Sequence, residues 1–238
     1  MKRTRAIRVG GSALISALFC LESGCGSGRP PIASSDAAAS PSSSSILAAY
    51  ERARVLAWDP SRRFKALFKA EVSRNVGGIS RGYLSVWWDG ATGTLHWRAS
   101  APIAGSLKGG LLRRGMKGGQ TTDGGASDQR GSLLPGRLAS DDILTCLLGA
   151  PESAPSSSSP FEETPKGLRL GIDRSKTSVL VDREGRPVEF SFPNGETVKL
   201  QPGEGVPRRI EAAGPDGSAV LTLESYSSWP GDERVPPA

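Results

Sequence analysis

The sequence predicts an α+β fold: a curved antiparallel β-sheet, or incomplete β-barrel, with helices packed on its concave side. Short segments in which apolar and polar residues alternate recur at regular spacing from Arg63 to Tyr226, a pattern typical of an antiparallel sheet whose consecutive strands are neighbours. Turn segments such as DGATG and PNG separate them, because Gly, Asn and Asp tolerate the positive φ of tight turns. Two other stretches have helical spacing of their apolar residues.

The first helical stretch is ILAAYERARVLAW, which begins at Ile46. Pro60 follows it and cannot continue a helix, since proline lacks the backbone N–H and clashes with the preceding turn. The spacing of the apolar residues predicts an amphipathic helix. Its expected buried side consists of Ile46, Leu47, Tyr50, Val55 and Leu56.

The first predicted strand is RFKALFKAEV, which alternates strictly between apolar and polar residues and is therefore expected to be half-buried. GYLSVWW and TLHWRAS follow as a hairpin, and the later strands are GLRLGID, TSVLVD, PVEFSF, ETVKLQ, RRIEAA and AVLTLESY. The expected inward face of the first strand consists of Phe64, Ala66, Phe68, Ala70 and Val72.

The second helical stretch interrupts the strands. Ser140 is a favourable N-cap, Asp141 and Asp142 lie in the first turn, where the helix dipole favours acids, and Gly149 suits the C-terminal cap. The apolar face of this helix must pack on the sheet, because no other apolar surface is predicted. That face consists of Ile143, Leu144, Leu147 and Leu148. The low-complexity stretches 117–132 and 152–160 are expected to be loops.

The N-terminus has the pattern of an export signal. Its basic opening MKRTRAIR precedes an apolar stretch, Val9 to Leu21, that is too short to span a bilayer. The segment LESGC resembles the lipobox of bacterial lipoproteins, in which the cysteine, here Cys25, is acylated with fatty acids such as palmitate and becomes the new N-terminus. Glu22 departs from the small or apolar residue usual in a lipobox. The alternative is ordinary signal cleavage nearby, which would leave a soluble periplasmic protein.

Four parts of the chain follow from these patterns. Residues 1–25 are the signal peptide and lipobox, and residues 26–45, rich in Ser, Ala and Pro, form a disordered tether because they contain too little apolar surface for a core. Residues 46–231 form the folded domain. Residues 232–238 form a disordered tail.

No residue set indicates catalysis, a metal or a cofactor. The single histidine, His96, shares its strand face with Arg98 and Ser100, and no motif supplies it with a nucleophile and an orienting acid. Cys146 lies in the apolar segment ILTCLLG, where a buried and inert thiol is expected. We therefore expect a protein that is not an enzyme.

The charge does not indicate a nucleic-acid partner. The formal net charge is +6, but four of the 30 basic residues and one of the 24 acidic residues precede Cys25, so the rest of the chain has a net charge of +3. Nucleic-acid-binding domains usually show a basic stripe on one face instead. The chain is expected to be a monomer.

The order of four segments resembles the LolA/LolB-type family, whose members sort lipoproteins to the outer membrane. Trp87 and the segment TLHWRASAPIAG resemble a hairpin and loop of that family, and ILTCLLG resembles the helix before the second half of its sheet. The other two segments are DREGRPVEFSFPNG and PRRIEAAGPDGSAVLTLESYSSW. Together they cover most of residues 50–229.

The resemblance implies a half-barrel in which helices form a lid over an apolar cavity. It also implies a function, the transient binding of acyl chains of lipoproteins or other lipids for transfer or insertion at the outer membrane. The resemblance also implies a lipid-anchored protein at the periplasmic face of that membrane. A periplasmic carrier protein would deliver the lipid ligand to it. The alternative is a lipid-anchored structural or adaptor protein with a filled core and no lipid ligand.

The expected ligand-binding residues are inward members of the alternating strands, together with residues matched to the family. Ile103, in the loop after TLHWRAS, matches an exposed apolar loop residue of the family. The complete set is Phe64, Phe68, Val72, Trp87, Leu95, Trp97, Ile103, Leu170 and Phe190.

Overall fold

The computed structural model describes most of the predicted domain. The described residues are 41–75, 78–100, 107–114, 120–121, 138, 140–155, 161–172, 177–215 and 217–230. Every described residue belongs to one compact unit of the chain. The predicted signal peptide with Cys25, most of the tether, Ile103 and the C-terminal tail therefore lie outside the described residues.

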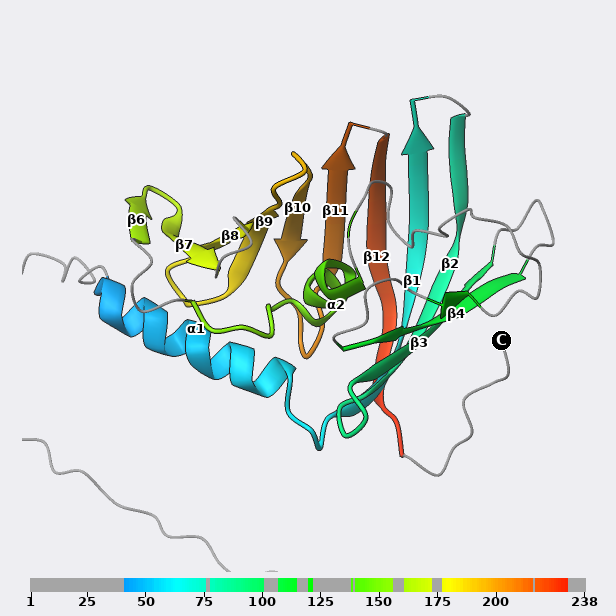
Figure 1. The fold of residues 1–238 in the computed structure, drawn as a ribbon, viewed down its shortest axis with the longest axis horizontal. Helices are drawn as coiled ribbons and strands as arrows, with labels where there is room; N and C mark the ends of the chain where they lie inside the picture. Colours follow the sequence, from blue (N-terminus) through cyan, green and yellow to red (C-terminus); the bar gives the residue numbers. More distant parts are fainter. Residues whose placement is uncertain are drawn as a thin grey trace, which may run out of the picture. The chain divides into compact units, whose positions relative to one another are not determined.

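Two helices and twelve strands make up the described part (Figure 1). In chain order they are α1 (Ser43–Ala57), β1 (Arg63–Arg74), β2 (Gly78–Asp89), β3 (Thr94–Ser100), β4 (Leu107–Arg113), β5 (Gln120–Thr121), α2 (Ser140–Leu148), β6 (Phe161–Thr164), β7 (Gly167–Ile172), β8 (Thr177–Val181), β9 (Pro187–Ser191), β10 (Thr197–Gln201), β11 (Arg209–Gly214) and β12 (Gly217–Ser228). None of the described helices is long and apolar enough to cross a membrane.

Helix α1 begins at Ser43, three residues before the predicted start of the domain. Ser42 is its N-cap: the Ser42 side chain accepts a hydrogen bond from the Ser45 N–H, which satisfies one of the free donors of the first turn. These serines carry no apolar signal, so the predicted helix starts too late. The capping hydrogen bond explains why the helix includes them.

The buried side of α1 also differs from the prediction. Ile46, Tyr50 and Ala57 are buried, whereas Val55 and Leu56 are 58% and 65% exposed. The helical repeat of 3.6 residues places Val55 on the opposite side of the helix from Ile46. The prediction for Val55 and Leu56 was therefore wrong, because apolar character was counted without its angle around the helix.

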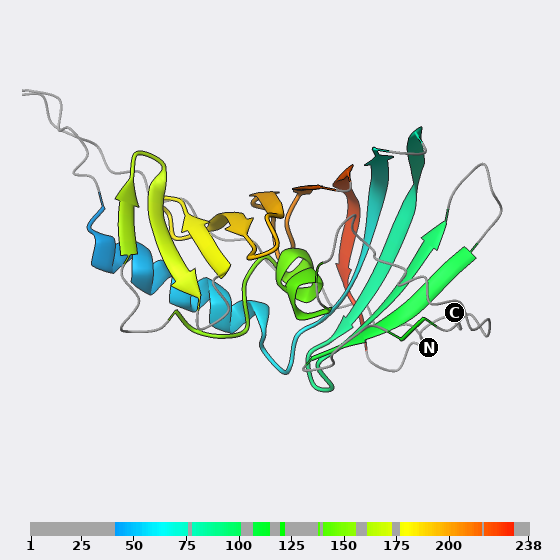
Figure 2. The same ribbon diagram turned by 45° about the horizontal axis from the view of Figure 1, so that its top comes forward.

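The twelve strands form one antiparallel sheet, as predicted, in the order β5-β4-β3-β2-β1-β12-β11-β10-β9-β8-β7-β6. The strands within β1–β5 and within β6–β12 each pair with their neighbours in sequence, and the β1–β12 pair joins these two meanders. Figures 1 and 2 show the resulting order of the strands across the sheet. Within the described residues, β5 and β6 each pair with a single strand, so the sheet is open.

One face of this sheet carries the hydrophobic core. The alternation predicted for β1 is confirmed, since Phe64, Ala66 and Phe68 are at most 5% exposed. Strand pairing continues this face on both sides through Trp88 of β2 and Leu221 of β12. The buried residues of α1 belong to the same hydrophobic cluster. The cluster also contains the predicted apolar face of α2, which is Ile143, Leu144, Leu147 and Leu148.

Helix α2 ends where predicted and begins one residue earlier, because Ser140, the predicted N-cap, is its first residue. Asp141 and Asp142 lie in its first turn, and Gly149 has φ of +75° immediately after its last residue, as expected for a C-terminal cap. Strand β6, which begins at Phe161, was not predicted. Its four residues FEET contain one apolar side chain and therefore show no recognisable alternation.

Candidate ligand-binding hollow

Most of the predicted ligand-binding residues are packed inside the core. Phe64, Phe68, Leu95 and Phe190 are at most 1% exposed, and Trp97 and Leu170 are 6% and 4% exposed. All six belong to the continuous buried cluster, and Val72 packs against it as a partly buried residue. These side chains are thus part of the packed core. Their role in binding a ligand stays a prediction.

Trp87 lies on the other face of the sheet. It alternates with the buried Trp88 along β2, and its cross-strand partners are Lys65 and His96. Successive side chains of a strand point to opposite faces, so Trp87 cannot line the same space as Phe64. The predicted role of Trp87 in ligand binding, which rests on the family resemblance, stays a prediction.

The structure instead contains a partly open hollow of about 540 Å³ at the ends of the two helices. Its walls come from the last turn of α1, the connection from α1 to β1, the end of α2, the start of β9 and the connection from β10 to β11. The lining residues are Ala53, Leu56, Ala57, Asp59, Ser61, Arg62, Leu148, Gly149, Ala150, Arg186, Pro187, Leu200, Pro202, Gly203, Gly205, Val206 and Pro207.

Arg62 holds three of these walls together. Its guanidinium donates hydrogen bonds to the carbonyl oxygens of Ala57, at the end of α1, and of Gly205, in the β10–β11 connection. Its Cζ lies 4.8 Å from the centre of the Phe64 ring, within the range of a cation–π interaction. Burial lowers the pKa of Arg62, and the neighbouring Tyr226 hydroxyl opposes that effect. Arginine remains charged at any ordinary pH, so the hollow contains a fixed positive charge.

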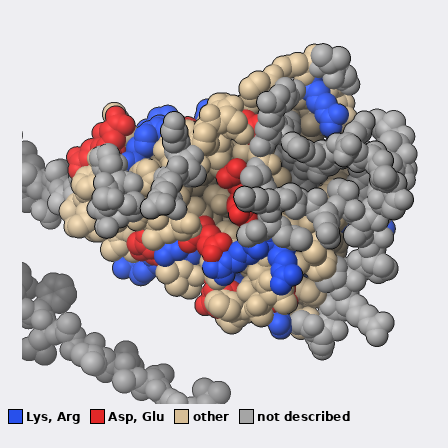
Figure 3. Space-filling view, viewed as in Figure 1, with Lys and Arg blue, Asp and Glu red and all other residues tan. Residues whose placement is uncertain are grey.

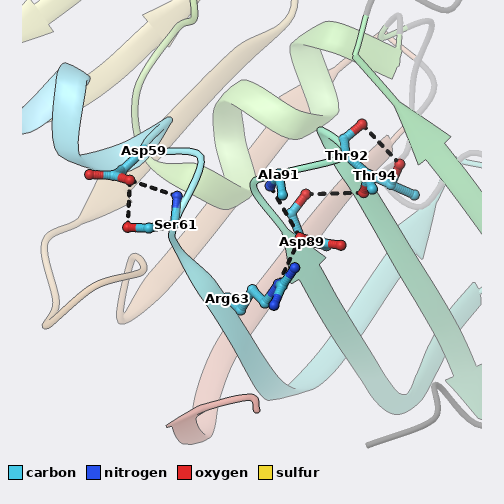
Figure 4. Close-up of polar contacts among 7 residues, drawn as sticks. All are labelled: Asp59, Ser61, Arg63, Asp89, Ala91, Thr92 and Thr94. Carbon is cyan, nitrogen blue, oxygen red and sulfur yellow. Dashed lines mark hydrogen bonds and ion pairs between the residues drawn. The ribbon is translucent and has the colours of Figure 1, made fainter. Parts of the chain in front are cut away.

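The connection that carries Arg62 is shaped by two aspartates (Figure 4). Asp59 Oδ1 accepts hydrogen bonds from the Ser61 Oγ at 2.6 Å and from the Ser61 N–H at 2.7 Å, and both lower the pKa of Asp59. Asp89 Oδ1 accepts from Arg63 Nε at 2.9 Å and from the Ala91 N–H at 3.1 Å. The β2–β3 turn is thereby fixed beside the start of β1.

The hollow is mainly apolar with charged groups at its border. Leu56, Leu148 and Val206 supply aliphatic surface. Arg186 is already paired with Asp182 Oδ2 at 2.8 Å and with Glu184 Oε2 at 2.7 Å. In the view of Figure 3, basic and acidic side chains lie next to one another over the described surface. Such a lining suits a ligand with a long apolar part.

The two side chains with the most reactive chemistry lie outside the hollow. Burial raises the pKa of the fully buried Cys146 thiol, and the carboxylates of Asp142 and Glu196 raise it further. The thiolate is the reactive form, so this environment makes Cys146 unreactive. Burial lowers the pKa of His96, which lies beside Trp87 on the opposite face of the sheet. Among the described residues, no group of three potential ligands could hold a metal.

Comparison with known proteins finds similarity among solved structures. No protein-family model matches the chain, and no curated protein sequence matches it significantly. The chain is similar to LolA superfamily structures. A LolA superfamily protein from Nitrosomonas europaea has a TM-score of 0.48 and 14% identity, and the match covers 78% of this chain and 94% of that one. An outer membrane lipoprotein-sorting protein domain from Vibrio parahaemolyticus has a TM-score of 0.42 and 12% identity, with 81% and 95% covered.

Two of these similar structures are named after the family that the sequence resembles or after lipoprotein sorting. The residues of the hollow, in contrast, were not predicted. The Pro- and Gly-rich segment QPGEGVP between β10 and β11 indicates a loop. Nothing in that segment shows that it faces the connection from α1 to β1, more than 140 positions earlier in the chain, where Arg62 donates its hydrogen bond to Gly205.

Proposed function

We propose that the protein binds acyl chains of lipoproteins or other envelope lipids for transfer or insertion at the outer membrane, and that a chain lies in the hollow between the ends of α1 and α2. The observation that carries this proposal is the apolar lining of a space of about 540 Å³. Ligand pockets usually measure about 300–1,000 Å³. The proposal includes a periplasmic location, an acyl anchor on Cys25, and α1 and α2 on the concave side of a half-barrel.

The energetics support an acyl chain as ligand. Transfer of one methylene group from water into an apolar site contributes about 0.8 kcal/mol. A chain of ten buried methylenes would therefore contribute about 8 kcal/mol before the cost of ordering the chain. Transfer of a lipid between sites needs no covalent step, so the hollow requires no nucleophile or general base.

Two neighbouring side chains of α1 provide a matched test. Leu56 lines the hollow and is 65% exposed, whereas Val55 is 58% exposed and does not line it. Leu56→Asp should weaken binding of a fluorescent fatty acid about tenfold, because it places a charge in the apolar lining. Val55→Asp makes a similar change on the same helical turn and should leave the affinity nearly unchanged.

Both variants should keep their melting temperature within a few degrees, since exposed substitutions usually change stability by less than about 0.5 kcal/mol. Equal affinities of the two variants would contradict the assignment of the hollow. Native mass spectrometry of the purified protein should also show co-purified lipid, which is removed by delipidation. Absence of lipid, together with no binding of added fatty acid, would contradict acyl-chain binding altogether.

One observation favours the second candidate, a lipid-anchored structural or adaptor protein. Phe64, Phe68 and Phe190 are completely buried in a continuous core. Side chains therefore fill the space on this part of the sheet face that a lipid carrier would leave as a cavity. An adaptor would bind no lipid in either experiment. The fatty-acid titration therefore separates the two candidates.

A further inference from the structure

The outer face of β1 and β2, opposite the core, combines exposed apolar side chains with basic ones. Along β2, Ile79 is 65% exposed and Tyr83 is 44% exposed, and Trp87 follows on the same face. Residues four apart in a strand point the same way, so the three side chains form one row. Within the described residues, the end of β2 before Tyr83 has no partner on the β3 side.

Basic side chains flank this row on both sides. Lys69 of β1 is exposed and is the cross-strand partner of Tyr83, and Arg98 of β3 is the partner of Ser85, between Tyr83 and Trp87. No ion pair with a carboxylate is formed by Lys69 or Arg98 in the described part of the chain. Arg81 does form one, with Glu71 at 2.9 Å. The row is therefore amphipathic and has an excess of positive charge.

We propose that this outer face of β1–β3, centred on Tyr83 and Trp87, docks on a membrane surface that contains anionic phospholipid. Tyr and Trp place an apolar ring and a polar group at the boundary between hydrocarbon and headgroups, and Lys and Arg are attracted to anionic headgroups. The charge of the face is complementary to such a surface. The proposal goes beyond acyl-chain binding and is independent of it, because this face and the hollow lie on opposite sides of the sheet.

The other half of the same outer face has a different character. Lys199 of β10 is exposed as well, but its cross-strand partners are Glu189 of β9 and Glu211 of β11. These carboxylates also pair with Arg169 and Arg209, and no large apolar side chain of β9, β10 or β11 is exposed. Replacing Lys199 therefore provides a control. It removes one positive charge from the same sheet face, as replacing Lys69 does, but outside the row of Ile79, Tyr83 and Trp87.

The test measures quenching of tryptophan fluorescence by brominated phospholipid in vesicles. The full chain carrying Cys25→Ser is used, so that no acyl anchor contributes. Vesicles contain phosphatidylcholine with or without phosphatidylglycerol. Trp58 is only partly buried and is therefore replaced by Phe in every protein tested, whereas Trp88, Trp97 and Trp229 are at most 7% exposed and residues 1–40 contain no tryptophan. Quenching therefore reports mainly on Trp87, even if the N-terminal segment also enters the bilayer.

Quenching is expected with phosphatidylglycerol vesicles and should be lost in Trp87→Phe. Lys69→Gln should weaken the affinity for these vesicles, measured by quenching, about fivefold, as expected for one charge near an anionic surface. Lys199→Gln should not weaken this affinity. Tyr83→Ser should weaken it too, with an unchanged melting temperature. The proposal is overturned by equal effects of Lys69→Gln and Lys199→Gln, or by quenching that persists in Trp87→Phe.

Two further outcomes would also overturn the proposal. Equal quenching on vesicles of phosphatidylcholine alone would show that headgroup charge is not recognised. A dimer in sedimentation that Tyr83→Ser dissociates, without quenching on vesicles, would assign this face to a second copy of the chain.

Discussion

The backbone of Gly110 in β4 lies directly under the indole ring of its cross-strand partner Trp97 in β3. A Cβ at Gly110 would come within 2.7 Å of Trp97 Nε1 and 2.8 Å of Trp97 Cε2. Trp97 is 6% exposed, so its ring has little room to move. The absence of a side chain at Gly110 therefore allows the large ring to pack flat in the core.

Gly110→Ala should destabilise the protein by about 1–3 kcal/mol, the usual cost of overpacking a core. Urea denaturation measures this as a lower midpoint at an unchanged slope. In a Trp97→Leu background, the same substitution should cost much less, since the atoms that clash have been removed. A cost that is equal in both backgrounds would contradict the contact as its cause.

A second prediction concerns two turn glycines with the same backbone conformation. Gly185 and Gly195 both have φ of +81°, but a Cβ at Gly185 would lie 2.4 Å from the Cβ of Ala49 in α1, whereas a Cβ at Gly195 would meet nothing within 4 Å. Gly195→Ala should cost about 1–2 kcal/mol, from left-handed strain alone. Gly185→Ala should cost about 1–3 kcal/mol more, because it also displaces α1.

Thermal denaturation of the two alanine variants measures this difference. If α1 packs on the β8–β9 turn as described, the Gly185 variant melts at a clearly lower temperature than the Gly195 variant. Identical melting temperatures would show that α1 does not approach this turn.

A third prediction concerns pH and the Asp89–Arg63 pair (Figure 4). Burial alone would raise the pKa of Asp89, but hydrogen bonds from Arg63 and from the Ala91 N–H, with the charge of Arg63, make the net shift downward. A carboxyl group whose pKa is lower in the folded state stabilises the fold above its unfolded value, about 3.9. That contribution is lost as the pH falls through the folded value.

Asp89→Asn should therefore destabilise the protein by about 0.5–1 kcal/mol at pH 7, a small value because solvent screens the partly exposed Arg63. The difference from wild type should shrink as the pH falls below about 4. Urea denaturation from pH 7 to pH 3 measures it. A difference that stays constant over this range would mean that the charge of Asp89 does not contribute.

The fourth prediction concerns the N-terminus. If Cys25 is acylated, Cys25→Ser should move the protein from the membrane fraction to the soluble fraction of lysed cells, because the acyl chains that hold it in the bilayer are absent. Immunoblotting of the two fractions measures this. Equal membrane association of both forms would contradict the lipid anchor. Signal cleavage alone does not distinguish the alternatives, since both require it.

Local signals predicted the regular elements well. The alternation in RFKALFKAEV led to β1, and the first-turn acid Asp141 with the capping residue Gly149 led to α2. Alternation and capping depend on neighbours in the chain, so they can be read from one sequence. Strand β6 and the start of α1 at Ser43 were missed, because β6 contains one apolar residue and the first turn of α1 contains only serines before Ile46.

The sequence by itself determined that the domain consists mainly of alternating strands and which of these strands follow one another, because period-two alternation and turn chemistry are local properties. Only the tertiary structure decided that β1 pairs with β12, that Trp88 rather than Trp87 faces the core, and that Arg62 joins α1 to the β10–β11 connection. These relationships join residues far apart in the chain. Their free energy comes from burial and hydrogen bonds that exist only after the two meanders have joined, so no local pattern contains them.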